Sequence, residues 1–231
     1  MTTISVMQPY LWPYAGYYRL LAASDVFVVY DCVQFIRRGR IHRNEFEAAG
    51  GTDWFTLPLA RPGFTDHIDA IRLSDDAEAE FAVRMRPFAR LSRSWATLAD
   101  FAAGDARLLA RAGAPLVDFL VAHLSLVARW LGLDCQIVRS SGLALPGDLR
   151  GEGRILAVCE ALHARRYVNV EGGRALYEPD SFARHGVALQ FLAPYRGAMT
   201  SVHERLADDP DDRARPARAV RAEIDTNLVY Q

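Results

Sequence analysis

The segment from Ser5 to Tyr18 constrains the fold of this chain more than any other. It places two prolines and one glycine among several aromatic residues. It begins within one short apolar run, Ile4–Met7, and precedes a second, Val26–Tyr30. Proline lacks a backbone N–H and clashes with the preceding helical turn, so this segment does not form the interior of a helix. A strand, a stiff loop, a short helix and a second strand are the parts of a β-α-β unit. Because the loop after such a strand faces the ligand crevice of an open α/β sheet, we expect the floor of a binding site here.

The charged residues limit the classes of partner and chemistry. The 231 residues carry a formal net charge of −1, which gives no electrostatic reason to expect nucleic acid or an anionic membrane as a partner. The chain contains no lysine, so its 27 basic residues are all arginine. Schiff-base chemistry and the phosphate-binding lysine of a P-loop are therefore excluded. Every basic side chain is instead permanently charged and suited to planar, bidentate recognition of anions.

The three cysteines, Cys32, Cys135 and Cys159, are scattered and show no Cys-x-x-Cys spacing. This pattern argues against a disulfide framework or a zinc site, and no other group of potential ligands has metal-binding spacing. Cys32 directly follows Asp31 at a strand end, so alternation along the strand predicts that their side chains point apart. No apolar run reaches the roughly 18 residues of a membrane span. We expect a cytoplasmic protein without a metal or a cofactor.

Runs rich in β-branched and aromatic residues alternate with helical patterns along the chain. This alternation indicates parallel crossovers and an α/β fold with a mainly parallel, Rossmann-like sheet. The predicted strands are Ile4–Met7, Val26–Tyr30, Trp54–Leu59, Ile68–Leu73, Gln136–Arg139, Tyr167–Val170 and Val187–Leu192. The predicted helices, which carry apolar residues at helical spacing, are Ala77–Arg93, Pro115–Leu131, Ile155–His163 and Pro179–His185.

Two of these strands interrupt the α/β pattern. Trp54–Leu59 and Ile68–Leu73 are predicted to pair as a hairpin through Pro62-Gly63. We interpret residues from about 50 to 132 as an antiparallel hairpin and helices inserted into a single domain over residues 1–207. From about residue 208 the chain becomes highly charged, which predicts a solvated C-terminal arm over residues 208–231.

The aromatic loop is the first candidate for binding or catalysis. Gln8 and Pro9 lie at the mouth of the first predicted strand, where we expect them to contact a ligand. Two interpretations fit Tyr10, Tyr14 and Tyr17. Either these rings line the site, or they only pack the loop onto the sheet.

The layout of this loop resembles the strand–turn–helix of nucleotidyltransferases and pantothenate-synthetase-like ligases, whose turn carries a pair of histidines that stabilise a transferred phosphate. Tyr14 and Tyr17 stand at the corresponding positions. A phenol donates a hydrogen bond but is neutral, and the chain has no lysine for the second loop of those enzymes. The resemblance therefore implies a nucleotidyltransferase-like (HUP-like) scaffold, while the tyrosines argue against nucleotide transfer.

A polar segment after the second predicted strand is the next candidate. It contains Asp31, Gln34, His42, Arg43 and Asn44. An aspartate and a histidine within one loop suit a general base and the group that orients it, and arginine suits a bound phosphate or carboxylate. The alternative is a solvated basic loop in which Arg43 pairs with Asp31 as a structural bridge.

Two later strand ends carry further candidates. Ser140 and Ser141 follow the strand at Gln136–Arg139, and their hydroxyl groups suit either an oxyanion or the capping of a turn. The strand at Tyr167–Val170 leads into a glycine pair whose backbone amides suit an anion, although a plain tight turn fits as well. The candidates there are Asn169, Glu171, Gly172 and Gly173. All four candidate segments follow strands, so a parallel sheet would gather them at one edge.

Taken together, these motifs resemble the WbqC-like family over most of the chain, from about Ile4 to Leu192. The matching residues are Gln8-Pro9-Tyr10, Pro13-Tyr14, Gly16-Tyr17, Asp31, Val33-Gln34-Phe35, Arg43-Asn44, Trp54–Pro58, Ser140-Ser141, Gly172-Gly173, Tyr177 and His185-Gly186. Two features depart from the family pattern. Many members have a second aspartate where this chain has Cys32, and the C-terminal end is more charged than expected.

The resemblance implies transfer of an aminoacyl or acyl group to an amino sugar or a similar amine, in the biosynthesis of surface glycans or specialised metabolites. The implied partners are that small amine and an acyl or aminoacyl carrier protein. Asp31 or His42 would serve as the base, and Asn44 with Ser140 or Ser141 would donate to the oxyanion. Arg43 and the Gly172-Gly173 turn would hold a pyrophosphate or a phosphopantetheine. The alternatives are an ATP-dependent ligase or nucleotidyltransferase on the same scaffold, and a non-catalytic module that binds a nucleotide sugar.

Overall fold

The computed structural model describes residues 1–101, 104–206, 212, 214–227 and 230, with the side chains of residues 97–101 left out. Its central element is a five-stranded parallel sheet in the order β5-β2-β1-β6-β7. The strands are β1 Thr3–Met7, β2 Val26–Val29, β5 Gln136–Arg139, β6 Arg166–Val170 and β7 Ala188–Leu192. The predicted α/β class and its mainly parallel sheet are confirmed.

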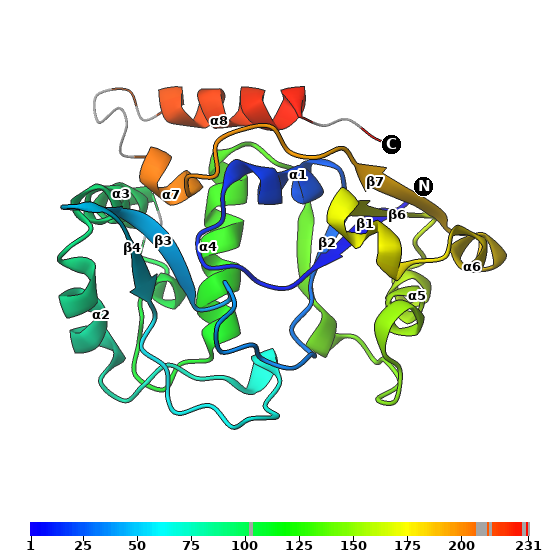
Figure 1. Cartoon of the computed structure of the whole chain (residues 1–231), viewed down its shortest axis with the longest axis horizontal. Coiled ribbons are helices and arrows are strands. Elements are labelled where there is room, and N and C mark those ends of the chain that lie inside the picture. Colours follow the sequence, from blue (N-terminus) through cyan, green and yellow to red (C-terminus); the bar gives the residue numbers. More distant parts are fainter. Residues whose placement is uncertain (102–103, 207–211, 213, 228–229, 231) are drawn as a thin grey trace.

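Helices cover both faces of this sheet (Figure 1). They are α1 Ala15–Ala22, α4 Leu116–Trp130, α5 Gly151–Ala161 and α6 Pro179–Arg184. Alternate residues of β2 show how the core divides: Phe27 and Val29 belong to the apolar cluster that contains α1 and α4, whereas Val26 and Val28 belong to the cluster that contains α5 and α6. A strand buried on both faces has no polar side, which is why β2 is a continuous apolar run in the sequence.

The antiparallel insertion is present, but its hairpin lies earlier in the chain than the sequence pattern predicts. The paired strands are β3 Arg43–Ala48 and β4 Gly51–Thr56. Buried Asn44 and Phe46 alternate with exposed Glu45 and Glu47 along β3, so the period-2 signal of a strand lies within the segment interpreted as a polar loop. The predicted Trp54–Leu73 hairpin is wrong. Residues Ile68–Ala70 form a 3₁₀ helix, and only a single antiparallel bridge joins Leu59 to Leu73.

The predicted helix Ala77–Arg93 is two helices, α2 Ala77–Met85 and α3 Ala89–Phe101. The break falls at Pro87, because proline disfavours the α conformation of the residue before it and cannot donate to the preceding turn. The other three predicted helices correspond to α4, α5 and α6. Gly186 follows α6 with φ of +67°, the left-handed conformation that a helix C-terminus favours for glycine.

The chain after β7 returns over α1. A short helix, α7 Val202–Arg205, is followed by α8 Ala214–Thr226, which lies along α1 (Figure 1). Although the sequence of α8 is highly charged, Val220 and Ile224 on one side of it are fully buried in the main apolar cluster. The predicted boundary at residue 207 lies outside the described residues.

Trp12 is the centre of an aromatic cluster that joins the sheet to the insertion. Its backbone has φ of +47°, a left-handed conformation that is uncommon for a bulky residue. Hydrogen bonds fix this turn, because Asn44 Nδ2 and Ser201 Oγ both donate to the Trp12 carbonyl oxygen, at 3.2 and 2.7 Å. The rings whose centroids lie 5.2 to 6.2 Å from the Trp12 ring are those of Phe46, Phe55, Phe81, Trp95, Phe119, His123 and His203.

The two histidines in this cluster make the stability of the fold depend on pH. Burial lowers the pKa of His123 to about 4 and the pKa of His203 well below its usual value, so both rings are neutral in the folded chain. Unfolded histidine titrates near 6.5, so acid protonates the unfolded state first. The stabilisation is complete above about pH 6.5 and is lost as pH falls toward 4, by on the order of 3 kcal/mol for His123 alone.

Denaturant unfolding at pH 7.5 and pH 5 tests this dependence. We expect His123→Leu to flatten the pH dependence, because the leucine cannot titrate in the unfolded state. The matched control is His185→Leu, since His185 is exposed on the opposite side of the sheet. Equal pH slopes in the two variants would contradict the assignment.

Candidate functional site

The four predicted site segments meet at one edge of the sheet. Residues Gln8-Pro9 follow β1, Asp31 follows β2, Ser140-Ser141 follow β5, and Glu171–Gly173 follow β6. Since all these strands are parallel, their carboxyl ends lie together. In the sheet, β2 and β5 lie on one side of β1, whereas β6 and β7 lie on its other side. The strand order therefore reverses between β1 and β6. This is the position at which open α/β sheets bind ligands.

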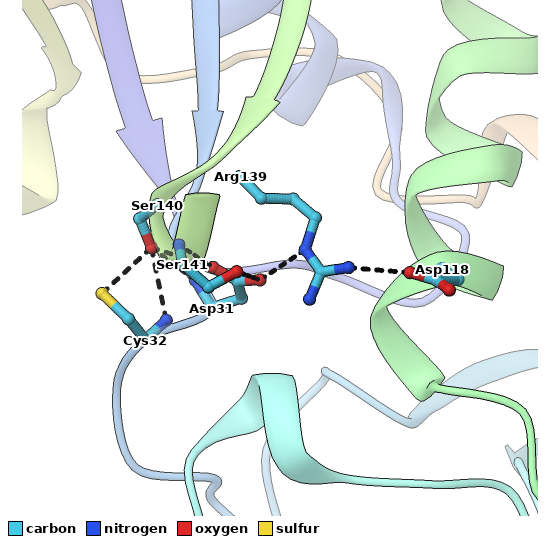
Figure 2. Close-up of polar contacts among 6 residues, drawn as sticks. All are labelled: Asp31, Cys32, Asp118, Arg139, Ser140 and Ser141. Carbon is cyan, nitrogen blue, oxygen red and sulfur yellow. Dashed lines mark hydrogen bonds and ion pairs between the residues drawn. The ribbon is translucent and has the colours of Figure 1, made fainter. Parts of the chain in front are cut away.

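Asp31 is the most highly connected side chain at this edge (Figure 2). It is fully buried, and each carboxylate oxygen accepts two hydrogen bonds. Oδ1 accepts from Ser140 Oγ at 2.9 Å and from the backbone N of Ser141 at 2.8 Å. Oδ2 accepts from Ser141 Oγ and from Arg139 Nε, each at 2.7 Å. Arg139 continues to Asp118 on α4 at 2.7 Å.

These contacts give Asp31 a positioning function. A carboxylate offers about four acceptor sites, and here all of them are taken by the chain itself. Ser140 Oγ also accepts the backbone N–H groups of Asp31 and Cys32, at 3.0 and 3.3 Å, which ties the end of β2 to the end of β5. The expectation that Asp31 acts as a base stays a prediction, and a substrate proton could reach it only after one of these donors is displaced.

Cys32 does not point away from Asp31, so that prediction is wrong. Ser140 Oγ lies 2.9 Å from Asp31 Oδ1 and 3.1 Å from Cys32 Sγ (Figure 2). The strand ends at Val29, and the alternation of side chains does not continue through the bend that follows it. On its other side, Cys32 Sγ accepts a hydrogen bond of 3.0 Å from the buried guanidinium of Arg154.

The aromatic loop is held in place from both ends. Near β1, Tyr17 donates its hydroxyl to the backbone oxygen of Gln8 at 2.8 Å. Near the hairpin, the two hydrogens of the Asn44 amide go to the carbonyl oxygens of Leu11 and Trp12, at 3.1 and 3.2 Å. Asn44 Oδ1 accepts from Tyr10 Oη at 3.3 Å. Asn44 therefore shapes the loop, and its amide hydrogens are not directed toward a substrate.

A cleft of about 780 Å³ opens beside this loop, between the hairpin and the segment before α7. Three of the predicted site residues, Tyr10, Tyr14 and Asn44, line it. The position of Tyr14 depends on Gly16, because a Cβ there would overlap the rings of Tyr14 and Tyr195. The polar residues of the lining are Tyr10, Tyr14, Arg40, Asn44, Glu45, Glu47, Thr52, Arg90, Thr200 and Glu204.

The cleft combines carboxylates with neutral phenols. Arg40 pairs with Glu45 at 2.7 Å, and Arg90 pairs with Glu47 at 3.0 Å. Glu204 is buried, and one of its carboxylate oxygens accepts the backbone N–H of Glu47 at 2.6 Å. Burial raises the pKa of both Tyr10 and Tyr14, so these phenols stay protonated near neutral pH and both donate and accept hydrogen bonds.

The other residues of the predicted polar segment lie apart from Asp31. Within the described part of the chain no hydrogen bond joins His42 to Asp31. The His42 ring packs on Phe35 at 5.1 Å, and burial together with the charge of Arg43 lowers its pKa to about 4. Arg43 stacks on Trp54 at 4.2 Å, so the proposed Arg43–Asp31 bridge does not form and Arg139 takes that place. The exposed Gln34 donates its amide to the backbone oxygen of Phe64.

The end of β6 is a packed turn. Asn169 is buried and donates to the hydroxyls of Tyr167 and Tyr177, at 3.0 and 3.3 Å. Gly173 is required there, since a Cβ would lie 2.8 Å from Asn169 Nδ2. Glu171 pairs with Arg174 at 2.8 Å, and Gly172 is exposed within the same 3₁₀ helix, Glu171–Leu176. Gln8 is half-buried at the neighbouring strand end, and its carboxamide has no hydrogen-bond partner among the described residues.

Sequence reasoning missed all five charged residues of the cleft, which are Arg40, Glu45, Glu47, Arg90 and Glu204. Each is far from Tyr10 in the sequence, and only the fold brings them together. Ser201 and Glu204 do form the Ser-x-x-Glu pattern that precedes a helix, and Ser201 does cap α7. That pattern predicts the helix but gives no sign of the cleft.

Among the described residues, no group of three or more His, Cys, Asp or Glu side chains is arranged to hold a metal ion. Among the same residues, no helix has both the length and the apolar character needed to cross a bilayer.

Substitution of Asp31 tests the positioning function. We expect Asp31→Asn to lower the free energy of unfolding by about 3 kcal/mol or more, because it removes a buried charge that four donors face. Asp118→Asn removes the other partner of Arg139, but this partner is partly exposed, so we expect a loss under about 1 kcal/mol. Denaturant unfolding of both variants measures the difference. Equal losses would show that the Asp31 contacts do not hold the strand ends together.

Comparison with known proteins agrees with the motifs described above. A model of the WbqC-like protein family matches residues 8–199. "Uncharacterized protein Rv1507c" of Mycobacterium tuberculosis (strain ATCC 25618 / H37Rv) is 32% identical over 63 residues, which is 27% of this chain and 27% of that relative. No solved structure matches the chain. Because the family model covers the sequence from the aromatic loop to the cleft residue Met199, the chain belongs to the WbqC-like protein family.

Proposed function

We propose that this protein is a transferase that moves an acyl or aminoacyl group to an amine, forming an amide, and that the cleft beside the aromatic loop holds the amine. The observation that carries the proposal is the combination of carboxylates and neutral phenols in one cleft of about 780 Å³. That volume lies within the usual range for sites of small molecules. An amino sugar from surface-glycan or specialised-metabolite biosynthesis is the acceptor that this lining fits best.

The charges of the cleft favour an ammonium group over an anion. Glu45 and Glu47 line the cleft with exposed side chains. Their carboxylates attract a positive amine and can accept its hydrogen bonds. The hydroxyl groups of Tyr10 and Tyr14 suit a ligand rich in hydroxyls, because each phenol can donate one hydrogen bond and accept another.

The bound ammonium first releases one proton to solvent, and the neutral amine nitrogen then attacks the carbonyl carbon of a thioester. A C–N bond forms, the C–S bond breaks, and the proton lost by nitrogen ends on the departing thiol. The enzyme needs a group to accept that proton and donors for the tetrahedral oxyanion. In the proposed site a carboxylate of the cleft takes the proton. Asp31 acts through Ser141 and Arg139, which it orients at the strand ends where the acyl donor would lie.

A second candidate function follows from the strand order. The order β5-β2-β1-β6-β7 is that of Rossmann-like sheets, which bind nucleotides where the order reverses. An ATP-dependent ligase would release pyrophosphate when ATP and a carboxylate are added. The missing lysine and the tyrosines at positions 14 and 17 disfavour that chemistry.

The Tyr14 hydroxyl offers a specific test of the cleft. It has no hydrogen-bond partner among the described residues, so Tyr14→Phe removes only a group that would contact the acceptor. We expect KM for an amino-sugar acceptor to rise roughly 3- to 10-fold in this variant, the effect of losing one hydrogen bond. Mass spectrometry of product formed from an acyl thioester and a nucleotide amino sugar measures the rate.

Tyr18→Phe is the matched control. Tyr18 also lies on the segment around α1, and its buried hydroxyl lacks a partner, but it does not line the cleft. We expect its KM to equal that of the unmodified protein.

Thermal stabilisation by the amino sugar without turnover for any acyl donor would point to a binding module, and pyrophosphate release would point to the ligase.

A further inference from the structure

An exposed surface of arginine and apolar side chains adjoins the candidate site. We call it the arginine surface. It is carried by the loop between β2 and β3 and by the two segments that touch this loop. Its members are Ile36, Arg37, Arg38, Arg40, Arg43, Trp54 and Phe64.

Two aromatic rings on this surface are covered by guanidinium groups. Arg37 lies over the Phe64 ring at 4.3 Å, and Trp54 lies against both Arg40 at 4.7 Å and Arg43 at 4.2 Å. The two stacks belong to one surface because Arg37 and Arg40 lie in a single loop, and Arg43, the first residue of β3, donates from Nη2 to the Arg38 carbonyl of that loop at 3.0 Å. Stacking of this kind holds the long arginine side chains in defined positions.

The arginine surface is apolar as well as positive. Phe64 is 83% exposed and Ile36 is 55% exposed, although both are large hydrophobic side chains. Exposed aromatic residues beside arginine are the composition that protein interfaces favour. Asp31 lies near the start of this loop, and Arg40 near its end lines the cleft. A partner bound here would therefore lie next to both parts of the candidate site.

We propose that the arginine surface docks an acidic protein domain that carries the acyl donor as a thioester on a flexible arm. This inference rests on the proposed function, because it names the source of the acyl group that the cleft would use. Carboxylates of the partner would meet Arg37 and Arg38, and apolar side chains of the partner would cover Ile36 and Phe64. Charge complementarity of this kind speeds association and selects the partner.

The observations favour a protein over a small anion or a nucleic acid. A small anion needs several guanidinium groups that converge on one point, whereas here they are spread along a loop and stacked on two different rings. Nucleic acid binding uses open aromatic faces for base stacking, and a guanidinium group lies over each of the two rings, Phe64 and Trp54. The formal net charge of −1 also gives no general attraction to a polyanion.

The experiment compares two donors that carry the same acyl group. One is the thioester of an acidic carrier protein, and the other is the free pantetheine thioester, which does not need docking. The tested variant is the double charge reversal Arg37→Glu with Arg38→Glu, since both residues are exposed and neither lines the cleft. The matched control is Arg165→Glu with Arg184→Glu, two exposed arginines near the amino ends of β6 and β7.

We expect the tested variant to raise KM for the carrier-linked donor at least tenfold and to leave turnover of the free thioester unchanged, while the control changes neither. Added salt should weaken use of the carrier-linked donor in the unmodified protein. Equal loss with both donors, or no loss with either, would overturn the docking inference. Competition by single-stranded RNA for the arginine surface would reassign it to nucleic acid. If the unmodified protein uses neither donor, the proposed function itself fails.

Discussion

The turn at Trp12 is the constraint on which the rest of the structure depends. A left-handed backbone at a bulky residue costs on the order of 1–3 kcal/mol and persists only where its surroundings fix it. Here the turn is fixed by the hairpin and by the segment before α7, and it holds both of them in place. Asn44 from the hairpin and Ser201 from the segment before α7 both bind the carbonyl oxygen of Trp12, while its indole fills the centre of the aromatic cluster. One residue of the β1–α1 loop thus joins three parts of the chain that are far apart in sequence.

The same turn determines where the cleft lies. Once Trp12 is buried, the neighbouring Tyr10 and Tyr14 are left on the outer side of the loop, and both line the cleft. Asp31 has a corresponding role at the other end of the site. Its carboxylate binds Ser140 and Ser141, which holds the end of β5 against the end of β2. The fold therefore uses its buried polar groups to fix backbone at the site, whereas the phenols of Tyr10 and Tyr14 and the carboxylates of Glu45 and Glu47 stay accessible. This division explains why the proposed chemistry uses the cleft and assigns Asp31 to positioning.

Sequence reasoning succeeded where a signal is local and failed where it is not. The parallel strands are short runs rich in β-branched and aromatic residues, so their positions and the α/β class could be predicted. The gathering of Asp31 with Ser140 and Ser141 follows from the same rule, because parallel strands end at one edge. The hairpin was misplaced because the alternation along Arg43–Ala48 is set among arginines and glutamates, which are typical of a loop. The contribution of Glu204 could not be predicted at all, since it depends on how the chain returns over the hairpin after β7.

The absence of lysine suggests one function for the arginines, whereas their contacts in the structure show another. Guanidinium groups suit phosphate or carboxylate, so a lysine-free chain suggests many anion sites. In the structure several arginines bind backbone carbonyls instead: Arg19 reaches the Ala193 oxygen at 2.7 Å, and Arg154 reaches the Leu149 oxygen at 2.9 Å. The planar guanidinium group has five donors and can bind several backbone carbonyl oxygens of one loop. An ammonium group, with three donors on a single nitrogen, does so less well. Arginine count alone therefore overstates anion binding, and the exposed guanidinium groups of the loop before β3 carry more information about partners than the total does.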